Sequence, residues 1–344
     1  MEPTTHIYAD SSQPSPHRPK PSRRKFAVIA IVAIILIAIL GRAFGADHQI
    51  SISNPFNHPA VSTTPTPTAD PDYAMPANDP NRLNVLVMGI RGLDDPDASD
   101  GGPLLTDSIQ IFSFDKTTKK SSIISIPRDL YVTIHDDKKD KLNTAYEYGF
   151  YHSSNSLQFI KDKFSQISGV YIDQVVIFNF SSFKDIIDAL GGVDVTLAAP
   201  FDEPKEWGFD FHLPAGVNHL DGTNALYYAR SRYSSTDFDR SARQQQIIFA
   251  IKDKLLKLNF FSDPVKSFNV INLIRNDIKT DIGLWDTKQY LDLANQVKFS
   301  EMKKSVISTD NFLVEGKGPD NAYILLPKGG SLSGIKQLFQ DSLK

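Results

Sequence analysis

The chain has 344 residues, with 37 Lys and Arg against 40 Asp and Glu, a net charge of −3, and no Cys. The absence of Cys excludes disulfide scaffolds, thiolate zinc sites, iron–sulfur clusters and cysteine nucleophiles. The slight negative charge argues against a dedicated nucleic-acid binder, which is usually basic. A chain of this length, 41% of it hydrophobic, can bury one large core or two smaller ones.

The N-terminal region predicts a membrane anchor. Residues 1–25 are basic and look disordered, and residues 26–44 form an almost uncharged apolar run that is rich in Ile. A membrane span needs about 20 apolar residues, and basic flanks stay on the cytoplasmic side. We therefore expect a single-pass anchor in the cell membrane, with the N-terminus cytoplasmic and the body extracytoplasmic. A cleaved signal peptide is the alternative, although the sequence around Ala43 is a poor cleavage site.

The rest of the chain divides into a linker and a body. Residues 45–82 are rich in Pro and Thr, which predicts an extended extracytoplasmic linker. In the body, residues 83–344, strands are expected at 83–90, 108–114, 121–126, 130–134, 174–180, 193–197, 304–308 and 322–326. Helices are expected at 157–164, 183–190, 222–229, 241–258, 285–297 and 333–342. Strands that alternate with helices predict one α/β domain with a mixed sheet and helices on both faces.

Several charged residues have no evident structural role in this pattern. Asp107 lies at the mouth of an apolar strand, and Arg128 and Asp129 follow the end of another. Arg230 and Arg232 alternate across a single residue, so both can project to one side of an extended chain. Any one of these Arg residues taken alone is more often a surface or ion-paired residue.

A further charged set has helical spacing. Asp237, Arg240 and Gln244 are three and four residues apart, which places them on one stripe if a helix begins by Asp237, and Arg243 lies beside that stripe. The alternative interpretation is a solvated helical face. Arg provides bidentate recognition of phosphate, and Asp provides oxygen ligands for Mg²⁺. Together the charged residues predict a site that handles phosphate groups.

Five segments in a fixed order resemble the LytR-CpsA-Psr family. They are LTDSIQIFSFD (105–115), SIPRDLYV (125–132), KLNTAYEYG (141–149), VVIFNFSSFKDIIDALGGVDV (175–195) and LDGTNALYYARSRYSSTDFDRSARQQQ (220–246). NAYILLPKGG (321–330) is similar to the closing segment of the family. The basic tail, single anchor and extracytoplasmic body fit the same resemblance.

The resemblance implies a phosphotransferase with an α/β/α sandwich fold. Such enzymes move a glycopolymer, for example a teichoic acid-type polymer, from a polyprenyl-pyrophosphate carrier to a peptidoglycan hydroxyl with the help of Mg²⁺. A hydrophobic groove receives the lipid, and an Arg-rich mouth receives the pyrophosphate. The expected partners are the lipid-linked glycan, peptidoglycan and the membrane, but no nucleic acid.

Site residues follow from the resemblance position by position. The implied catalytic residues are Arg128, Arg230, Arg232, Asp237 and Arg240; the implied substrate-binding residues are Arg243, Gln244, Lys141, Asn143 and Arg91; and the implied metal ligands are Asp107 and Asp95. One departure concerns the family's Gly-x-Asp, where this chain has Gly89, Ile90 and Arg91. Asp94, Asp95 or Asp97 can supply the missing acid, and Asp95 is preferred. The role of Asp237 is left open between a base and an orienter of Arg240.

Two questions stay open at the level of sequence. The Phe residues can line a lipid groove or form core, and core is favoured for most of them; they are Phe178, Phe180, Phe183, Phe201, Phe209, Phe211 and Phe249. The same site would also serve a polyprenyl-pyrophosphate pyrophosphatase, in which water replaces the sugar hydroxyl. A non-enzymatic envelope protein that binds lipid or has a regulatory role is the third hypothesis.

Overall fold

The computed structural model describes residues 71–95, 102–233, 235–257, 278–282, 293, 296, 297 and 301–344. The predicted cytoplasmic tail and anchor lie outside these residues, and so does the linker up to residue 70. Within the described ranges, no helix has both the length and the apolar content that a membrane crossing requires. The described chain reaches its first strand at Arg82, next to the predicted start of the body.

A six-stranded sheet forms the centre of the molecule, in the order β11-β6-β1-β2-β3-β12. Its strands are β1 (Arg82–Ile90), β2 (Thr106–Asp115), β3 (Ser121–Ser125), β6 (Gln174–Phe178), β11 (Ile278–Thr280) and β12 (Lys303–Val306). β1 runs parallel to β6 and antiparallel to β2, and β12 runs parallel to β3. The predicted mixed sheet is therefore confirmed.

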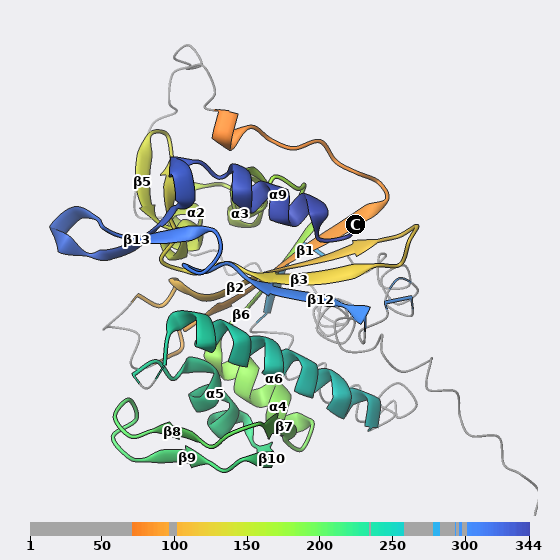
Figure 1. The fold of residues 1–344 in the computed structure, drawn as a ribbon, viewed down its shortest axis with the longest axis vertical. Coiled ribbons are helices and arrows are strands. Elements are labelled where there is room, and N and C mark those ends of the chain that lie inside the picture. The colour runs from red at the N-terminus through yellow and green to blue at the C-terminus, as the bar shows by residue number, and fades with distance from the viewer. Residues whose placement is uncertain are drawn as a thin grey trace, which may run out of the picture.

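Helices cover both faces of this sheet, as Figure 1 shows. On one face lie α2 (Ala145–His152), α3 (Ser156–Ser168) and α9 (Ser333–Asp341); on the other lie α4 (Phe180–Ala189), α5 (Gly222–Arg230) and α6 (Asp237–Lys257). Neighbouring residues of β1 point to opposite faces, so Val85 belongs to the core under α4, α5 and α6, and Leu86 to the core under α3 and α9. The predicted helices on both faces are thus present.

Four two-stranded sheets surround the centre. They pair β4 (Tyr131–His135) with β5 (Lys138–Lys141), β7 (Val193–Leu197) with β10 (Gly216–Leu220), β8 (Phe201–Glu203) with β9 (Phe211–Leu213), and β13 (Leu313–Lys317) with β14 (Tyr323–Pro327). The sequence predicted β4, β7 and β14 and missed their partners, the β8–β9 pair, and α2. These missed segments are short or charged, so they lack the hydrophobic period on which the prediction depends.

The transition from β6 to α4 is set by a capping box. The Asn179 side chain accepts a bond from the Ser182 N–H at 2.8 Å, and the Asn179 N–H donates to the Ser182 Oγ at 3.0 Å. These bonds satisfy N–H groups at the helix start, so α4 begins at Phe180. The predicted strand, which continued to residue 180, was therefore two residues too long. Most of the predicted helix at 285–297 lies outside the described residues.

Candidate active site

A polar cavity of about 350 Å³ lies where β1, β2 and the end of β3 meet the C-terminus of α5 and the start of α6. We call it the polar cavity. Six of its lining residues are cationic and three are acidic, so it carries a local excess of positive charge. The residues that line it are Arg91, Leu105, Asp107, Arg128, Asp129, Lys141, Asn143, Glu206, Arg230, Arg232, Arg240 and Gln244. Nine of the twelve predicted site residues are in this set.

Asp107 is held by two arginines at the start of β2. Its carboxylate forms an ion pair with the Arg128 guanidinium. Its backbone carbonyl accepts a bond from Nη2 of Arg240 at 3.1 Å. Arg240 is only 3% exposed, so its charge is placed at the cavity wall by burial as well as by this bond. β2 and α6 are thereby fixed relative to each other at the centre of the cavity.

Asp129 orients the neighbouring cations. Its Oδ1 lies 2.7 Å from Nζ of Lys141, and its Oδ2 lies 3.5 Å from Nε of Arg128. The Asn143 N–H donates to the Arg128 carbonyl at 3.0 Å. The predicted substrate-binding residues Lys141 and Asn143 are therefore connected to the loop that carries Arg128.

The Arg230 guanidinium packs against two aromatic rings. Its guanidinium carbon lies 4.3 Å from the Phe180 ring centroid and 5.2 Å from that of Trp207. Such cation–π contacts fix the plane of the guanidinium and leave its edge available for bidentate bonding. Burial lowers the pKa of Arg230, and among the nearby charges Asp107 raises it most. The side chain still stays charged at neutral pH because an Arg guanidinium loses its proton only at very high pH.

The segment after α5 is braced by the connection between β8 and β9. The Arg232 N–H donates to Oε2 of Glu206. Nε1 of Trp207 donates to the Ser231 Oγ at 3.0 Å, and that hydroxyl donates to the Tyr227 carbonyl at 2.8 Å. These bonds hold both predicted arginines of this segment at the polar cavity, although Arg230 ends a helix and is not on an extended strand.

Helix α6 supplies the predicted stripe. It begins at Asp237, as the stripe requires, and Arg240 and Gln244 both reach the polar cavity. Nε2 of Gln244 also donates to the Ala229 carbonyl at 3.4 Å, which connects α6 to α5. The side chain of Asp237 lies outside the described part of the chain.

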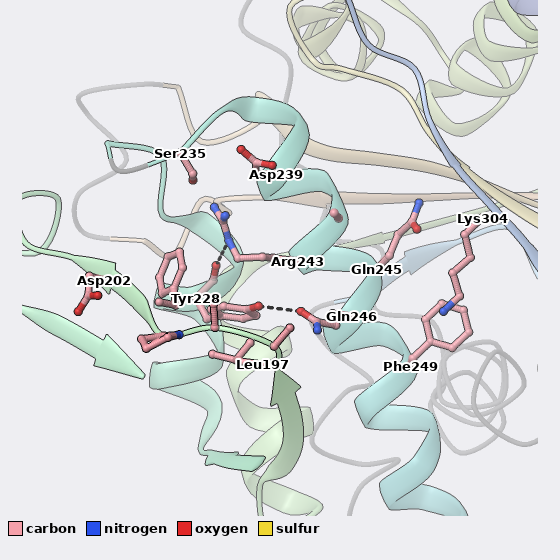
Figure 2. Close-up of a pocket in the computed structure, with 15 residues that line it drawn as sticks. Leu197, Asp202, Tyr228, Ser235, Asp239, Arg243, Gln245, Gln246, Phe249 and Lys304 are labelled. Atoms are coloured by element: carbon pink, nitrogen blue, oxygen red, sulfur yellow. Dashed lines mark hydrogen bonds between the residues drawn. The ribbon is translucent and has the colours of Figure 1, made fainter. Parts of the chain in front are cut away.

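Arg243 does not line the polar cavity. It lines another cavity next to α6, where it extends toward Tyr228 (Figure 2). Its Nε donates to the Tyr228 carbonyl at 2.9 Å, and its Nη2 donates to the Ser231 carbonyl. Both acceptors lie at the C-terminal end of α5, where a cation also interacts favourably with the helix dipole. Burial lowers the pKa of this guanidinium. Arg243 therefore contacts the helix end that presents Arg230, not the polar cavity itself.

A second cavity of about 800 Å³ opens on the Arg243 side of α6. Its described charged residues balance, with Arg243 and Lys304 against Asp202 and Asp239. We call it the second cavity.

The two predicted metal ligands are both ion-paired. Asp95 lies 3.2 Å from Nε of Arg91, and Asp107 is paired with Arg128. In the described part of the chain, no group of three or more His, Asp or Glu is placed to hold a metal ion. Mg²⁺ in phosphate-transfer sites is commonly held by one or two carboxylates plus substrate phosphates. Both Asp residues raise the pKa of the Arg230 guanidinium, so both lie near a cation of the polar cavity, although Asp95 does not line it.

An apolar cavity of about 50 Å³ adjoins the polar one and shares Asp107, Arg230 and Gln244 with it. The other residues that line it are Gly89, Ser108, Phe178, Phe180, Phe183, Leu226, Ala229 and Ile248. We call it the apolar cavity. A water molecule occupies about 30 Å³ in the liquid, so this cavity is little larger than one or two water molecules. A polyprenyl chain is much larger and must displace side chains to enter.

The seven highlighted Phe residues divide between cavity and core. Only Phe178, Phe180 and Phe183 line the apolar cavity. Phe201 and Phe211 pack into the core below the sheet, at ring distances of 5.1 Å from Tyr228 and 5.7 Å from Tyr227 respectively. The remaining two lie elsewhere: Phe209 is 47% exposed, and Phe249 lines the second cavity.

Sequence reasoning missed two residues of this site, Glu206 and Trp207. Both lie in the connection between β8 and β9, which has no hydrophobic period and no recognisable motif. The composition held one weak signal, since Trp207 is one of only two Trp in the chain. Their place at the cavity follows from tertiary packing against the end of α5.

The fold has a three-layer α/β/α architecture, and the candidate site is a cavity with an excess of cations, which suits an anionic group. The LytR_cpsA_psr family model matches residues 50–338, which is most of the chain, and the chain belongs to this family.

Several curated relatives are named as transferases, and others as the regulatory protein MsrR. TagU of Enterococcus faecalis, a polyisoprenyl-teichoic acid–peptidoglycan teichoic acid transferase, is 26% identical over 298 residues, which cover 86% of this chain and 90% of that protein. TagV of Bacillus subtilis has the same description and is 29% identical over 272 residues, or 76% of this chain and 64% of that protein.

Solved structures agree on the fold. The crystal structure of Bacillus subtilis TagV has a TM-score of 0.58 and 26% identity, and it covers 77% of this chain and 98% of that one. A structure described as TagT bound to LI-WTA has a TM-score of 0.55 and 22% identity, and covers 80% of this chain and 93% of that one. At that identity, the second likeness supports the fold alone.

Proposed function

We propose that this protein transfers a glycopolymer from a polyprenyl-pyrophosphate carrier to a peptidoglycan hydroxyl. One observation carries the proposal: a cation-lined polar cavity adjoins an apolar cavity, and Arg230 lines both. A polyprenyl pyrophosphate has the same two parts in the same order, a doubly charged head joined to a hydrocarbon tail. The transferase names of the relatives support the same substrate class.

The arginines supply the main catalytic effect in this proposal. Arg128, Arg230, Arg232 and Arg240 bind the pyrophosphate and neutralise the charge that develops on the leaving polyprenyl phosphate. They are in place before substrate binds, because ion pairs, ring contacts and burial fix most of them. Such preorganisation means that little reorganisation is needed during the reaction.

The remaining predicted residues take supporting roles. Arg91, Lys141, Asn143 and Gln244 contact the substrate from the cavity wall. Arg243 acts as a positioning residue, because its bonds hold the end of α5 that carries Arg230. Asp237 remains in the proposed catalytic machinery through its place at the first residue of α6.

Mg²⁺ is the proposed cofactor, with Asp107 and Asp95 as the residues that would hold it. When bound, the ion neutralises phosphate charge. Removal of a divalent ion by a chelator should therefore reduce turnover, and readdition of Mg²⁺ should restore it.

The proposed location is the extracytoplasmic side of the cell membrane. The predicted anchor at 26–44, followed by a Pro- and Thr-rich linker, would keep the catalytic domain near the membrane that holds the lipid carrier. A tethered domain meets a membrane-bound substrate at a high effective concentration.

The test uses the full chain in detergent micelles with a polyprenyl-pyrophosphate-linked glycan and purified peptidoglycan. The expected product is glycan in phosphodiester linkage to peptidoglycan, with one polyprenyl phosphate released per transfer. Release of lipid phosphate at the same rate without acceptor would favour the pyrophosphatase instead. Lipid binding with no turnover of any kind would favour the non-enzymatic alternative.

A further inference from the structure

The proposed transfer requires a group that accepts the proton of the attacking hydroxyl, and three carboxylates line the polar cavity. Two of them are occupied by cations. Asp107 is paired with Arg128, and Asp129 with both Lys141 and Arg128. Carboxylates that are paired in this way have fewer lone pairs available to an incoming hydroxyl.

Glu206 differs from the other two. Its hydrogen-bond partners are backbone groups: the Arg232 N–H donates to Oε2, and the Tyr233 N–H also donates to the carboxylate. In the described part of the cavity it is the one carboxylate without a Lys or Arg nitrogen within ion-pair distance. The carboxylate is thus anchored by backbone groups, and its negative charge is not taken up by a direct ion pair.

The loop that carries Glu206 is held in place on both sides. The next residue, Trp207, donates to the Ser231 Oγ at 3.0 Å and packs on Arg230. The Arg232 N–H that binds Glu206 belongs to the same segment. The carboxylate is therefore positioned against the arginines that bind the pyrophosphate, and not merely near them in the fold.

We propose that Glu206 is the general base that accepts the proton of the acceptor hydroxyl. This inference rests on the proposed transferase function and adds a residue that the family resemblance does not supply. In the step, the acceptor oxygen forms a bond to the phosphorus that carries the glycan, and its proton passes to Glu206. The bond from that phosphorus to the bridging oxygen breaks, and polyprenyl phosphate leaves with the electron pair. The proton is then released from Glu206 to solvent.

The electrostatic surroundings agree with this role. Burial raises the pKa of Glu206 above its ordinary value, and the nearby Glu203 of β8 raises it further. The Tyr233 backbone N–H, Arg230 of α5 and Arg240 of α6 oppose that shift with smaller effects. A base works best when its pKa is close to the working pH, so a raised carboxyl pKa favours proton acceptance.

The experiment compares Glu206→Gln with the wild-type chain and with Asp202→Asn as a matched control. Asp202 is an exposed acid on the neighbouring strand β8 and lies in the second cavity, outside the proposed machinery. The full chain in detergent is assayed for glycan transfer to peptidoglycan from pH 4 to pH 9. Binding of geranylgeranyl pyrophosphate is measured separately.

Glu206→Gln is expected to lower kcat by about 10² to 10⁴, the usual contribution of a general base, with little change in lipid binding. In the wild type, kcat should rise with pH as the Glu206 carboxyl loses its proton, and this acid limb should disappear in the variant. Asp202→Asn should keep both the wild-type kcat and the rise of kcat with pH. Formate should restore part of the activity of Glu206→Ala, which a purely structural role would not allow.

A rate within threefold of wild type, or an unchanged acid limb, in Glu206→Gln would overturn the assignment. If that variant does not fold, a failure of formate to rescue a folded Glu206→Ala would do the same. These results leave the proposed function standing, since the wild type still transfers glycan. Absence of transfer by the wild type would contradict the proposed function instead.

Discussion

The polar cavity and the second cavity lie on two sides of one helix, α6, and they differ in their balance of charge. On one side, the polar cavity collects six cations against three acids around Arg240. On the other, the second cavity is larger and its charges balance around Arg243. The two arginines lie three residues apart in sequence, yet Arg240 lines the polar cavity beside Asp107, whereas Arg243 lines the second cavity and donates to two carbonyls at the end of α5. Charge excess, and not cavity size, therefore marks the candidate active site.

The largest expected effect comes from Arg230→Ala, which removes the cation shared by the polar and apolar cavities. Transition-state arginines in phosphoryl transfer contribute about 10³ to 10⁵ in kcat, and we expect a loss in that range. The measurement is kcat for glycan transfer, with the melting temperature as a control for folding. Near-normal turnover by the folded variant would show that the polar cavity is not the reaction site.

The next effect separates the two arginines of α6 directly. Arg240→Gln should lower kcat by about 10² to 10³, as the loss of a preorganised charge does. Arg243→Gln should lower it at least tenfold less, because it acts only through the end of α5. Both variants leave backbone carbonyls without a donor, at a cost of about 1–3 kcal/mol each. Equal losses of kcat would erase the distinction between the two sides of the helix.

A smaller effect is expected from Phe183→Trp, which fills part of the apolar cavity. Each methylene kept from burial costs about 0.8 kcal/mol, so the exclusion of about two methylenes should raise the KM for a long polyprenyl donor about tenfold, with kcat little changed. A donor with the same glycan linked to geranyl pyrophosphate, whose tail is short, is the control and should show a smaller change. Identical shifts for both donors would place the lipid tail elsewhere.

The smallest effect should follow from Lys304→Ala in the second cavity. The Lys304 ammonium lies 3.6 Å from the Phe249 ring centroid and far in the sequence from every residue of the polar cavity. We expect kcat/KM to stay within about twofold of wild type, as for surface substitutions away from a site. A tenfold loss would mean that the second cavity also takes part in substrate binding.

Much of this site was predictable because it lies where strands and helices end. Asp107 and Arg128 flank buried strands whose apolar runs are plain in the sequence, and the sheet then brings those strand ends together. Arg240 and Gln244, four residues apart, share a helical face, whereas Arg243 is rotated away from it. Helical periodicity predicted that Arg243 points in a different direction from Arg240 and Gln244, but it did not show what Arg243 contacts.

Other parts depended on tertiary contacts that no local pattern encodes. Glu206 and Trp207 reach the cavity because β8 and β9, three residues each, form a hairpin against α5. The aromatic pair around Arg230 combines Phe180, the first residue of α4, with Trp207 from that hairpin. Phe content predicted aromatic packing, but it did not separate the three cavity residues from the rest.

The parallel edge strand β12 has a consequence for how the chain is made. Every residue that lines the polar cavity precedes residue 245, yet β3 gains its outer partner only from residues 303–306. Gln245 of α6 also reaches this edge, donating to the Ser125 Oγ at 2.8 Å and to the Ser305 carbonyl at 3.2 Å. Until residues 303–306 are synthesised and pair, β3 offers unpaired backbone groups to other chains. Nascent chains stalled short of this strand should thus be the species most prone to aggregate.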